Sequence, residues 1–142
     1  MEGFGAPYEL PNLTAYNETC AAVANVFFNY GMYLDSGDAK FLDIAELSLF
    51  NNSLAGMNLH GDRFFYVNPL EADGVRRFNH GNGGRAKWFG CACCPPNISR
   101  LILQTGFLCQ LNGMKNHIVI LYQISLYKQI SITFEHIQCQ IF

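Results

Sequence analysis

Three cysteines fall within four positions of the stretch WFGCACCPPNISR, which runs from residue 88 to residue 100. Cys93 and Cys94 are adjacent, and Cys91 stands two positions before Cys93. Thiols gathered this densely indicate metal binding or nucleophilic catalysis, and the competing explanations are an oxidised pair or coincidence. The spacing of the three cysteines does not decide between these explanations.

A second pair of potential metal ligands lies far upstream, in the sequence NETC, where Glu18 and Cys20 are two positions apart. Zinc takes about four ligands from Cys, His, Asp and Glu, and structural sites usually draw them from two separated pairs. Combining this pair with the adjacent cysteines gives a candidate zinc site of one carboxylate and three thiols. Its members are Glu18, Cys20, Cys93 and Cys94.

This quartet sets a condition on the backbone around Glu18. In a regular α-helix, side chains at positions i and i+2 point roughly 200° apart around the axis, so Glu18 and Cys20 cannot both face one metal from within a helix. A helix must therefore begin near Thr19 or be irregular there. With Thr19 as the N-cap, Glu18 is extended and Cys20 lies in the first turn, where the helix dipole favours a thiolate.

The remaining cysteines and histidines have simpler explanations. Free cysteine is among the most buried residue types, so Cys109 and Cys139 on apolar segments are expected in the core, and the same explanation competes for Cys20 taken alone. The histidines stand singly in loops or strands, and each is expected to be a surface or turn residue. They are His60, His80, His117 and His136.

Apolar side chains at helical spacing predict two helices in the first part of the chain. One lies within residues 14–34 and the second over residues 39–54, separated by the break DSGD at 35–38. Two helices across so short a turn are expected to form a hairpin.

The second part of the chain is expected to be less regular. RFFYVNP at 63–69 predicts a short strand or extended segment, and a polar loop over 71–85 follows it, closed by the cysteine cluster. A third helix is expected from about residue 97 to residue 111, entered through two prolines. The tail after residue 112 is rich in Ile, Val, Thr, Tyr and Phe, which predicts two or three strands.

Composition narrows the class of protein and its partners. The chain has 142 residues and a hydrophobic fraction of 50%, enough for the core of about one domain. Its net charge is −2 and charged residues make up 14%, so no basic stripe is available and neither nucleic acid nor a membrane surface is an expected partner. The start of the chain lacks the basic and apolar regions of a signal peptide, which predicts a cytoplasmic protein with reduced thiols.

Four long stretches, in order, resemble glycoside hydrolase family 127, the bacterial β-L-arabinofuranosidases. They are YELPNLTAYNETCA, MYLDSGDAKFLDIAE, NNSLAGMNLHGDRFFYVNPLE and WFGCACCPPNISRL. The resemblance implies a mainly α fold in which residues 1–112 form part of an (α/α)6 catalytic barrel, made of a helical hairpin, the cysteine loop and a helix. Residues 113–142 would then be a few β-strands that begin a β-sandwich domain.

The resemblance also implies the roles of individual residues. In this family a zinc ion is held by the glutamate and cysteine of ETC and by the adjacent cysteines of CACCPPN, which correspond to the quartet named above. Cys93 is then also the nucleophile, and Glu2 of MEGF is the general acid/base. Tyr66 of FFYVNP corresponds to a tyrosine beside the nucleophile that contacts substrate. The implied reaction releases L-arabinose from non-reducing-end β-L-arabinofuranosides of an oligosaccharide or glycoconjugate, with retention of configuration.

The chain departs from the family pattern at its start. Met1 stands where the family has a glycine before the acid/base, and the family's earlier barrel segments and sugar-holding histidines have no counterpart here. We therefore expect an incomplete and inactive fragment of the enzyme. The alternative is a non-catalytic zinc-binding remnant, whose site only ties helices to a loop.

Overall fold

The computed structural model of the chain describes the backbone of residues 5–110 and the side chains of residues 5–105. Its contacts divide the chain into two units, residues 1–104 and residues 105–142, and the described elements belong to the first unit apart from the end of the last helix. Glu2 and the strands predicted after residue 112 lie outside the described residues.

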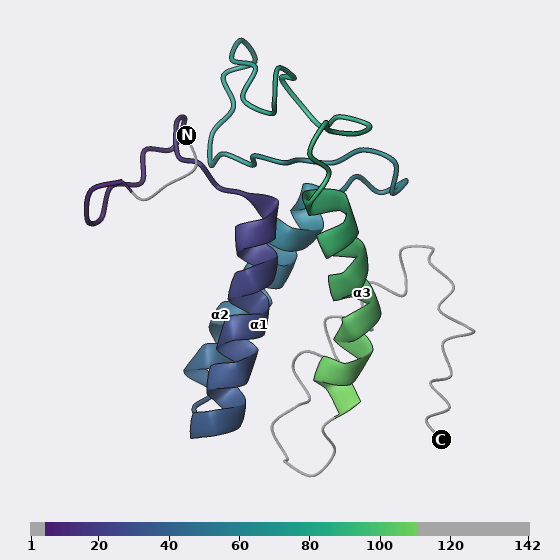
Figure 1. The fold of residues 1–142 in the computed structure, drawn as a ribbon. Helices are drawn as coiled ribbons and strands as arrows, with labels where there is room; N and C mark the ends of the chain where they lie inside the picture. The colour runs from purple at the N-terminus through teal and green to yellow at the C-terminus, as the bar shows by residue number, and fades with distance from the viewer. Residues whose placement is uncertain (1–4, 111–142) are drawn as a thin grey trace. The chain divides into compact units, whose positions relative to one another are not determined.

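Helices dominate the described part, as predicted. They are α1 (Thr19–Ser36), α2 (Lys40–Ser48) and α3 (Cys94–Gln110), with a π-helical turn η1 (Leu49–Ser53) and a 3-10 turn η2 (Leu54–Gly56) after α2. Between residues 5 and 110 extended segments pair only through isolated bridges, so no β-strand forms there. The long segment from η2 to α3 lies beyond the ends at which α1 and α3 begin (Figure 1). Within the described part, none of the helices has the length and apolarity that crossing a membrane requires.

The first helix begins where the metal-site hypothesis requires it to begin. Glu18 is extended, with φ −78° and ψ 135°, and forms an isolated antiparallel bridge with Val67. The N–H of Thr19 donates to the carbonyl oxygen of Tyr66 at 3.0 Å, and helical geometry starts at that residue. The first helical turn therefore carries Cys20 while Glu18 stays outside it.

The prediction that Thr19 is the N-cap is wrong by one residue. The cap position is Glu18, and the Thr19 hydroxyl donates instead to the carbonyl oxygen of Phe65 at 2.8 Å. Thr19 is fully buried and lies against Gly56, where a Cβ atom would stand 2.6 Å from the Thr19 methyl group. The absence of a side chain at Gly56 is what allows η2 to approach the start of α1 so closely.

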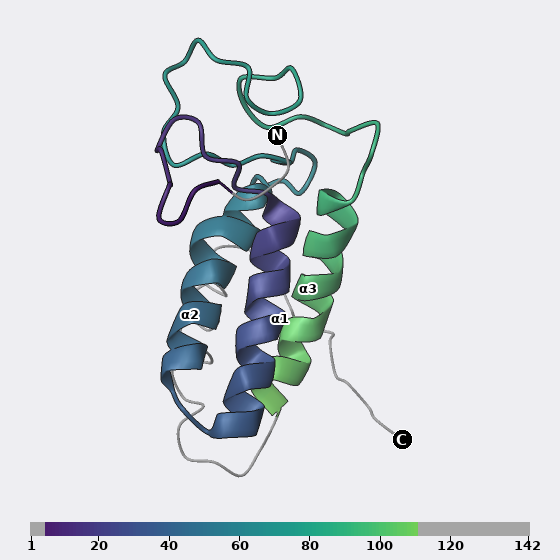
Figure 2. The ribbon, with the colours of Figure 1, turned by 60° about the vertical axis from the view of Figure 1, so that its left-hand side comes forward.

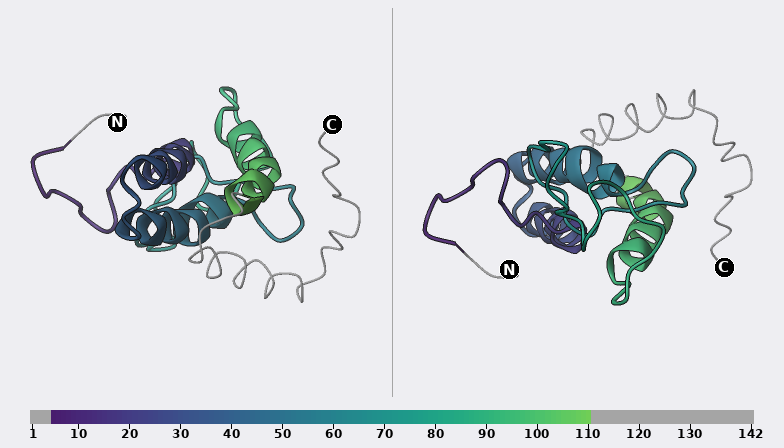
Figure 3. Two further views of the ribbon diagram at one scale, coloured as in Figure 1. Left: turned by 90° about the horizontal axis from the view of Figure 1, so that it is seen from below. Right: turned by 90° about the horizontal axis from the view of Figure 1, so that it is seen from above.

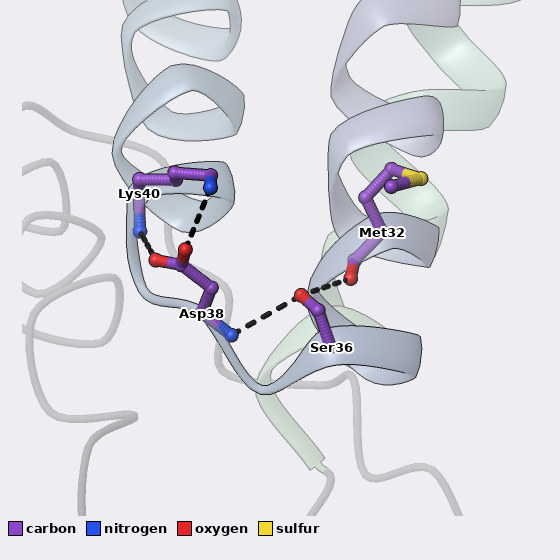
Figure 4. A network of polar contacts seen from close by, with 4 residues as sticks. All are labelled: Met32, Ser36, Asp38 and Lys40. Atoms are coloured by element: carbon purple, nitrogen blue, oxygen red, sulfur yellow. Dashed lines mark hydrogen bonds and ion pairs between the residues drawn. The ribbon is translucent and has the colours of Figure 1, made fainter.

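The break between α1 and α2 is built from local polar contacts (Figure 4). Gly37 takes φ 69°, and its N–H donates to the carbonyl oxygen of Tyr33 at 2.8 Å, which ends α1 with a left-handed glycine. The Ser36 hydroxyl accepts the N–H of Asp38 at 3.2 Å. The Asp38 carboxylate then accepts the N–H of Lys40 at 3.0 Å and pairs with its ammonium group at 2.7 Å.

Helices α1 and α2 form the predicted hairpin and pack side by side (Figure 2). Apolar side chains on one face of each helix are buried. These are Ala22, Val23, Val26 and Tyr33 on α1, and Leu42 and Ala45 on α2. The predicted second helix extends to residue 54, but α2 ends at Ser48 and the chain winds on through η1 and η2.

The third helix begins three residues earlier than predicted, because the two prolines lie inside its first turn. Pro95 and Pro96 follow Cys94, the first residue of α3, and a first-turn proline loses no helical hydrogen bond. Figure 3 shows α3 beside the α1–α2 hairpin when viewed along the helices. Cys94, Ile98 and Leu101 are fully buried at the start of α3 and form part of its core face.

A buried amide, Asn79, holds the extended segment 64–67 in place. Its Oδ1 accepts the backbone N–H groups of Tyr66 at 2.8 Å and Val67 at 3.3 Å. Its Nδ2 donates to the carbonyl oxygens of Phe64 at 3.1 Å and Gly84 at 2.8 Å. Every hydrogen-bonding capacity of this fully buried side chain is thereby used, and it connects the polar loop to the segment that contacts α1.

We predict that Asn79→Ala lowers the free energy of unfolding by at least about 3 kcal/mol, because several buried backbone groups lose their partner at once. Asn82→Ala is the matched control, since the exposed Asn82 amide donates only to the carbonyl oxygens of Asn79 and His80. We expect the control to lose about 1 kcal/mol or less. Urea denaturation of the two variants makes the comparison, and equal losses would show that the buried amide has no special role.

Candidate metal centre

The structure brings the four predicted ligand residues together at the starts of two helices. Glu18 immediately precedes α1 and Cys20 lies in its first turn, whereas Cys93 immediately precedes α3 and Cys94 begins it. One ligand atom from each of the four lies within 4.8 Å of all the others. Among the described residues this is the one group of three or more His, Cys, Asp or Glu side chains close enough to share a metal ion.

The distances within the cluster fit a tetrahedral ion. The Cys20 thiol donates to the Cys94 sulfur at 3.3 Å, and the sulfurs of Cys93 and Cys94 are 3.8 Å apart. The Glu18 Oε1 atom is 3.8 Å from the Cys93 sulfur and 4.0 Å from the Cys94 sulfur. Around zinc, bonds of about 2.3 Å to sulfur and about 2.0 Å to oxygen give tetrahedral edges of about 3.8 Å between sulfurs and about 3.5 Å between sulfur and oxygen.

The backbone conformation at the start of each helix explains how two ligands so close in sequence can both face the position of the metal ion. Extended geometry at Glu18 and helical geometry from the next residue onwards turn its carboxylate toward the same side as the Cys20 thiol. At the other helix, Cys93 lies just outside α3 and Cys94 is its first residue. Both helices direct their N-terminal ends at the cluster, and the partial positive charge of a helix N-terminus favours thiolates.

The family model described as beta-L-arabinofuranosidase, GH127 catalytic domain, matches residues 1–106. The chain belongs to the GH127 family. The non-reducing end beta-L-arabinofuranosidase of Bifidobacterium longum subsp. longum is similar to it, with 46% identity over 105 residues that make up 71% of this chain and 16% of the relative. The resemblance read from the sequence motifs is therefore confirmed.

Solved GH127 structures share the fold of the described part. A GH127 beta-arabinofuranosidase matches with a TM-score of 0.67 and 48% identity, covering 75% of this chain and 16% of that chain. The GH127 beta-L-arabinofuranosidase from Geobacillus stearothermophilus T6 matches with a TM-score of 0.66 and 45% identity, covering 74% and 17%. The chain spans about a sixth of the length of these relatives.

Tyr66 lies beside the cluster in this GH127 chain. Its carbonyl oxygen is 3.9 Å from the Cys94 sulfur, and its side chain belongs to the buried core cluster on which Cys93 packs. The Tyr66 ring stacks obliquely on His80, with ring centroids 4.2 Å apart, and meets Phe89 edge to face at 5.5 Å. The structure thus brings Tyr66 near the predicted nucleophile, while its contact with substrate stays a prediction.

Outside the cluster, Cys91 and the two histidines that the structure describes lie on the surface, as predicted for the histidines. Cys91 is exposed and does not join the cluster, and His60 and His80 are exposed turn residues. The side chain of Cys109 lies outside the described part, and so do three whole residues, Cys139, His117 and His136. What was expected of them stays a prediction.

Sequence reasoning missed three residues around the centre. Asn79 organises the segment that carries Tyr66, and no periodic pattern marks it. His80 follows it with φ 46°, a left-handed conformation that is uncommon outside glycine, and its ring packs on Tyr66. Asn97 donates to the Cys20 sulfur at 3.2 Å. Its spacing from Cys94, three positions along a helix, is a signal that becomes readable once α3 is known to begin at Cys94.

Burial controls the protonation of the thiols when no metal is bound. It raises the pKa of the Cys20 thiol to about 11, and the hydrogen bond from Asn97 opposes part of this rise. Burial and the contact with Cys20 raise the pKa of Cys94 well above its ordinary value. Both thiols are therefore protonated at neutral pH in the metal-free chain, although a zinc ligand must be a thiolate.

We predict that zinc binding at pH 7 releases the protons of at least Cys20 and Cys94, so that the apparent affinity rises with pH. Titration calorimetry in buffers of different ionisation enthalpy measures the proton release directly, and zinc binding without it would contradict the assignment of these thiols as ligands. For the metal-free chain, stability is expected to fall as the pH rises, whereas zinc affinity is expected to increase. Its stability falls between about pH 9 and about pH 11, because Cys20 ionises earlier in the unfolded chain than in the folded one.

Proposed function

We propose that this GH127 chain carries the metal centre and the nucleophile of a retaining glycosidase, which releases L-arabinose from non-reducing-end β-L-arabinofuranosides. The observation that carries the proposal is the gathering of one carboxylate and three thiols within 4.8 Å, in a chain that matches the GH127 catalytic domain over residues 1–106. The substrate would be an arabinofuranoside oligosaccharide or glycoconjugate, and the cofactor would be Zn²⁺.

Glu18, Cys20, Cys93 and Cys94 would hold the zinc ion. A single hard carboxylate and three soft thiolates suit zinc better than magnesium or calcium, which take oxygen ligands. When bound, zinc would keep the nucleophilic sulfur in its thiolate form at neutral pH.

Cys93 is the thiol best placed to act as the nucleophile. Cys94 is fully buried, so a sugar cannot reach its sulfur. Cys20 is held by the side-chain amide of Asn97. Cys93 is partly exposed and stands just before α3, and its polar side-chain contacts in the described part are with the other three members of the cluster.

The proposed reaction has two displacements. The Cys93 sulfur attacks the anomeric carbon, an S–C bond forms, and the glycosidic C–O bond breaks while Glu2 protonates the departing oxygen. A water molecule then attacks the same carbon, Glu2 accepts its proton, and the S–C bond breaks to release arabinose with retained configuration. Sulfur here takes the place of the carboxylate that most retaining glycosidases use.

Tyr66 is proposed to contact the sugar at this centre. Its ring contacts those of His80 and Phe89, which also contact each other, and it belongs to the core cluster that includes Cys94 and packs on Cys93. Tyr66 and Phe89 are buried while His80 is exposed, so a sugar at this centre would reach Tyr66 through its small exposed part.

We further propose that residues 1–112 form part of an (α/α)6 catalytic barrel and that residues 113–142 begin a β-sandwich domain. The match of the GH127 catalytic domain to residues 1–106 supports the first assignment. The composition of the tail supports the second.

A non-catalytic zinc site is the second candidate function. The cluster joins the starts of α1 and α3, and a metal ion there would tie the two helices to the segment around Tyr66. A site of this kind would stabilise the fold without any reaction at Cys93.

Labelling with a thiol-reactive L-arabinofuranose analogue separates the two functions. We predict that the analogue modifies Cys93 and spares the more exposed Cys91, because binding of the sugar would bring its reactive carbon to the nucleophile. Peptide mass spectrometry identifies the labelled residue, with Cys93→Ala and Cys91→Ala as paired variants and a glucose analogue as the ligand control. Equal modification of both cysteines, or labelling by the glucose analogue, would favour the non-catalytic site.

Hydrolysis by the 142-residue chain alone is expected to be absent or very slow. The chain spans about a sixth of the length of the GH127 relatives, so it would supply the thiols and only part of a sugar site. Turnover of an arabinofuranosyl disaccharide that disappears in Cys93→Ala would contradict this expectation while supporting the nucleophile.

A further inference from the structure

We propose that Asn97 is a positioning residue of the metal centre: its amide N–H group fixes Cys20 as a lasting ligand and leaves Cys93 as the sulfur able to react. The inference rests on the proposed function, because it assigns different tasks to the three thiols that would share the zinc ion. It concerns a residue outside the ligand quartet, which acts through Cys20.

The contact is direct and follows from the spacing of the sequence CCPPN. Asn97 stands three positions after Cys94 on α3, so the two side chains lie on the same face of the helix. That face meets the first turn of α1, where the Asn97 Nδ2 atom donates to the Cys20 sulfur at 3.2 Å. Asn97 therefore bridges the two helix starts that form the centre.

The orientation of the amide is set by a second contact. Arg100, one turn further along α3, donates from its Nη1 atom to the Asn97 Oδ1 atom at 3.1 Å. A guanidinium group can only donate hydrogen bonds, so its partner atom in Asn97 must be the oxygen. The amide nitrogen is therefore the atom that faces Cys20, and it presents an N–H group to the sulfur.

The three sulfurs differ in the hydrogen-bond donors and other polar groups that face them. Among the described residues, Cys20 is the one cluster thiol that accepts a hydrogen bond from a side-chain N–H group, while the Cys94 sulfur accepts one from the backbone N–H of Cys20. The Cys94 sulfur faces the Tyr66 carbonyl oxygen and the other members of the cluster. The polar side-chain neighbours of the Cys93 sulfur are a carboxylate oxygen and the two other cluster sulfurs.

An N–H donor changes what a thiolate can do. A hydrogen bond to an ionised sulfur is charge-assisted, so it stabilises the negative charge on Cys20 and fixes the side chain in one orientation. Electron density drawn toward the donor is no longer available for attack on carbon. A sulfur without such a side-chain donor stays more nucleophilic, and of the other two cluster sulfurs Cys93 is partly exposed while Cys94 is fully buried.

Cobalt(II) substitution reports on this hydrogen bond independently of any turnover. In Asn97→Leu, which removes the donor and roughly keeps the volume, we expect the thiolate-to-cobalt charge-transfer band to move to lower energy. Zinc affinity, measured by chelator competition, should fall about 10-fold to 100-fold, as is typical when a partner of a metal ligand is removed. Gln104→Leu is the matched control on the same helix, because Gln104 is exposed and distant in sequence from the cluster, and it should leave both readouts unchanged.

The outcomes separate failure of this inference from failure of the proposed function. If the unsubstituted chain binds neither cobalt nor zinc, the proposed metal centre itself is wrong, and the role of Asn97 falls with it. If the unsubstituted chain binds cobalt and Asn97→Leu shows the same band and the same zinc affinity, the positioning role alone is overturned. Circular dichroism verifies that each variant is folded. Should Asn97→Leu not fold, the nearly isosteric Asn97→Asp, which also lacks the donor, decides the question by the same two readouts.

Discussion

The whole candidate centre depends on one residue with extended backbone, Glu18, placed immediately before a helix. Its carboxylate and the Cys20 thiol are two positions apart, a spacing that would point them in opposite directions inside a helix. The bridge to Val67 and the hydrogen bond from Thr19 to the Tyr66 carbonyl oxygen make the change of conformation fall between the two ligands. Moving the start of α1 by even one residue toward the N-terminus would remove the carboxylate from the cluster.

The extended segment that imposes this constraint is not part of a sheet. It is held by the buried amide of Asn79 together with isolated backbone bridges to neighbouring segments. The same segment places the Tyr66 carbonyl oxygen near Cys94, so one irregular stretch is in contact with both helix starts. The geometry of the candidate metal centre at the starts of two helices thus depends on a loop, and the buried amide of Asn79 connects that loop to the extended segment.

The sequence alone predicts the parts of this structure that follow from periodicity and from the spacing of ligand pairs. The helical hairpin, the start of α1 near Thr19 and the meeting of Glu18 with the three thiols are of this kind. The sequence predicts the start of α3 three residues too late, because two prolines indicate a boundary but fit equally well inside a first turn. Asn79 could not be predicted, since its partners are backbone groups 12 to 15 positions before it and five after it, and no pattern links them.

X-ray absorption spectroscopy of the zinc-loaded chain tests the central claim most directly, because it identifies the atoms bound to the metal. The account predicts three sulfur neighbours at about 2.3 Å and one oxygen neighbour at about 2.0 Å, with no contribution from the outer ring atoms of histidine. A spectrum with imidazole in the shell, or with two sulfurs or fewer, would contradict the assignment of Glu18, Cys20, Cys93 and Cys94 as the ligands.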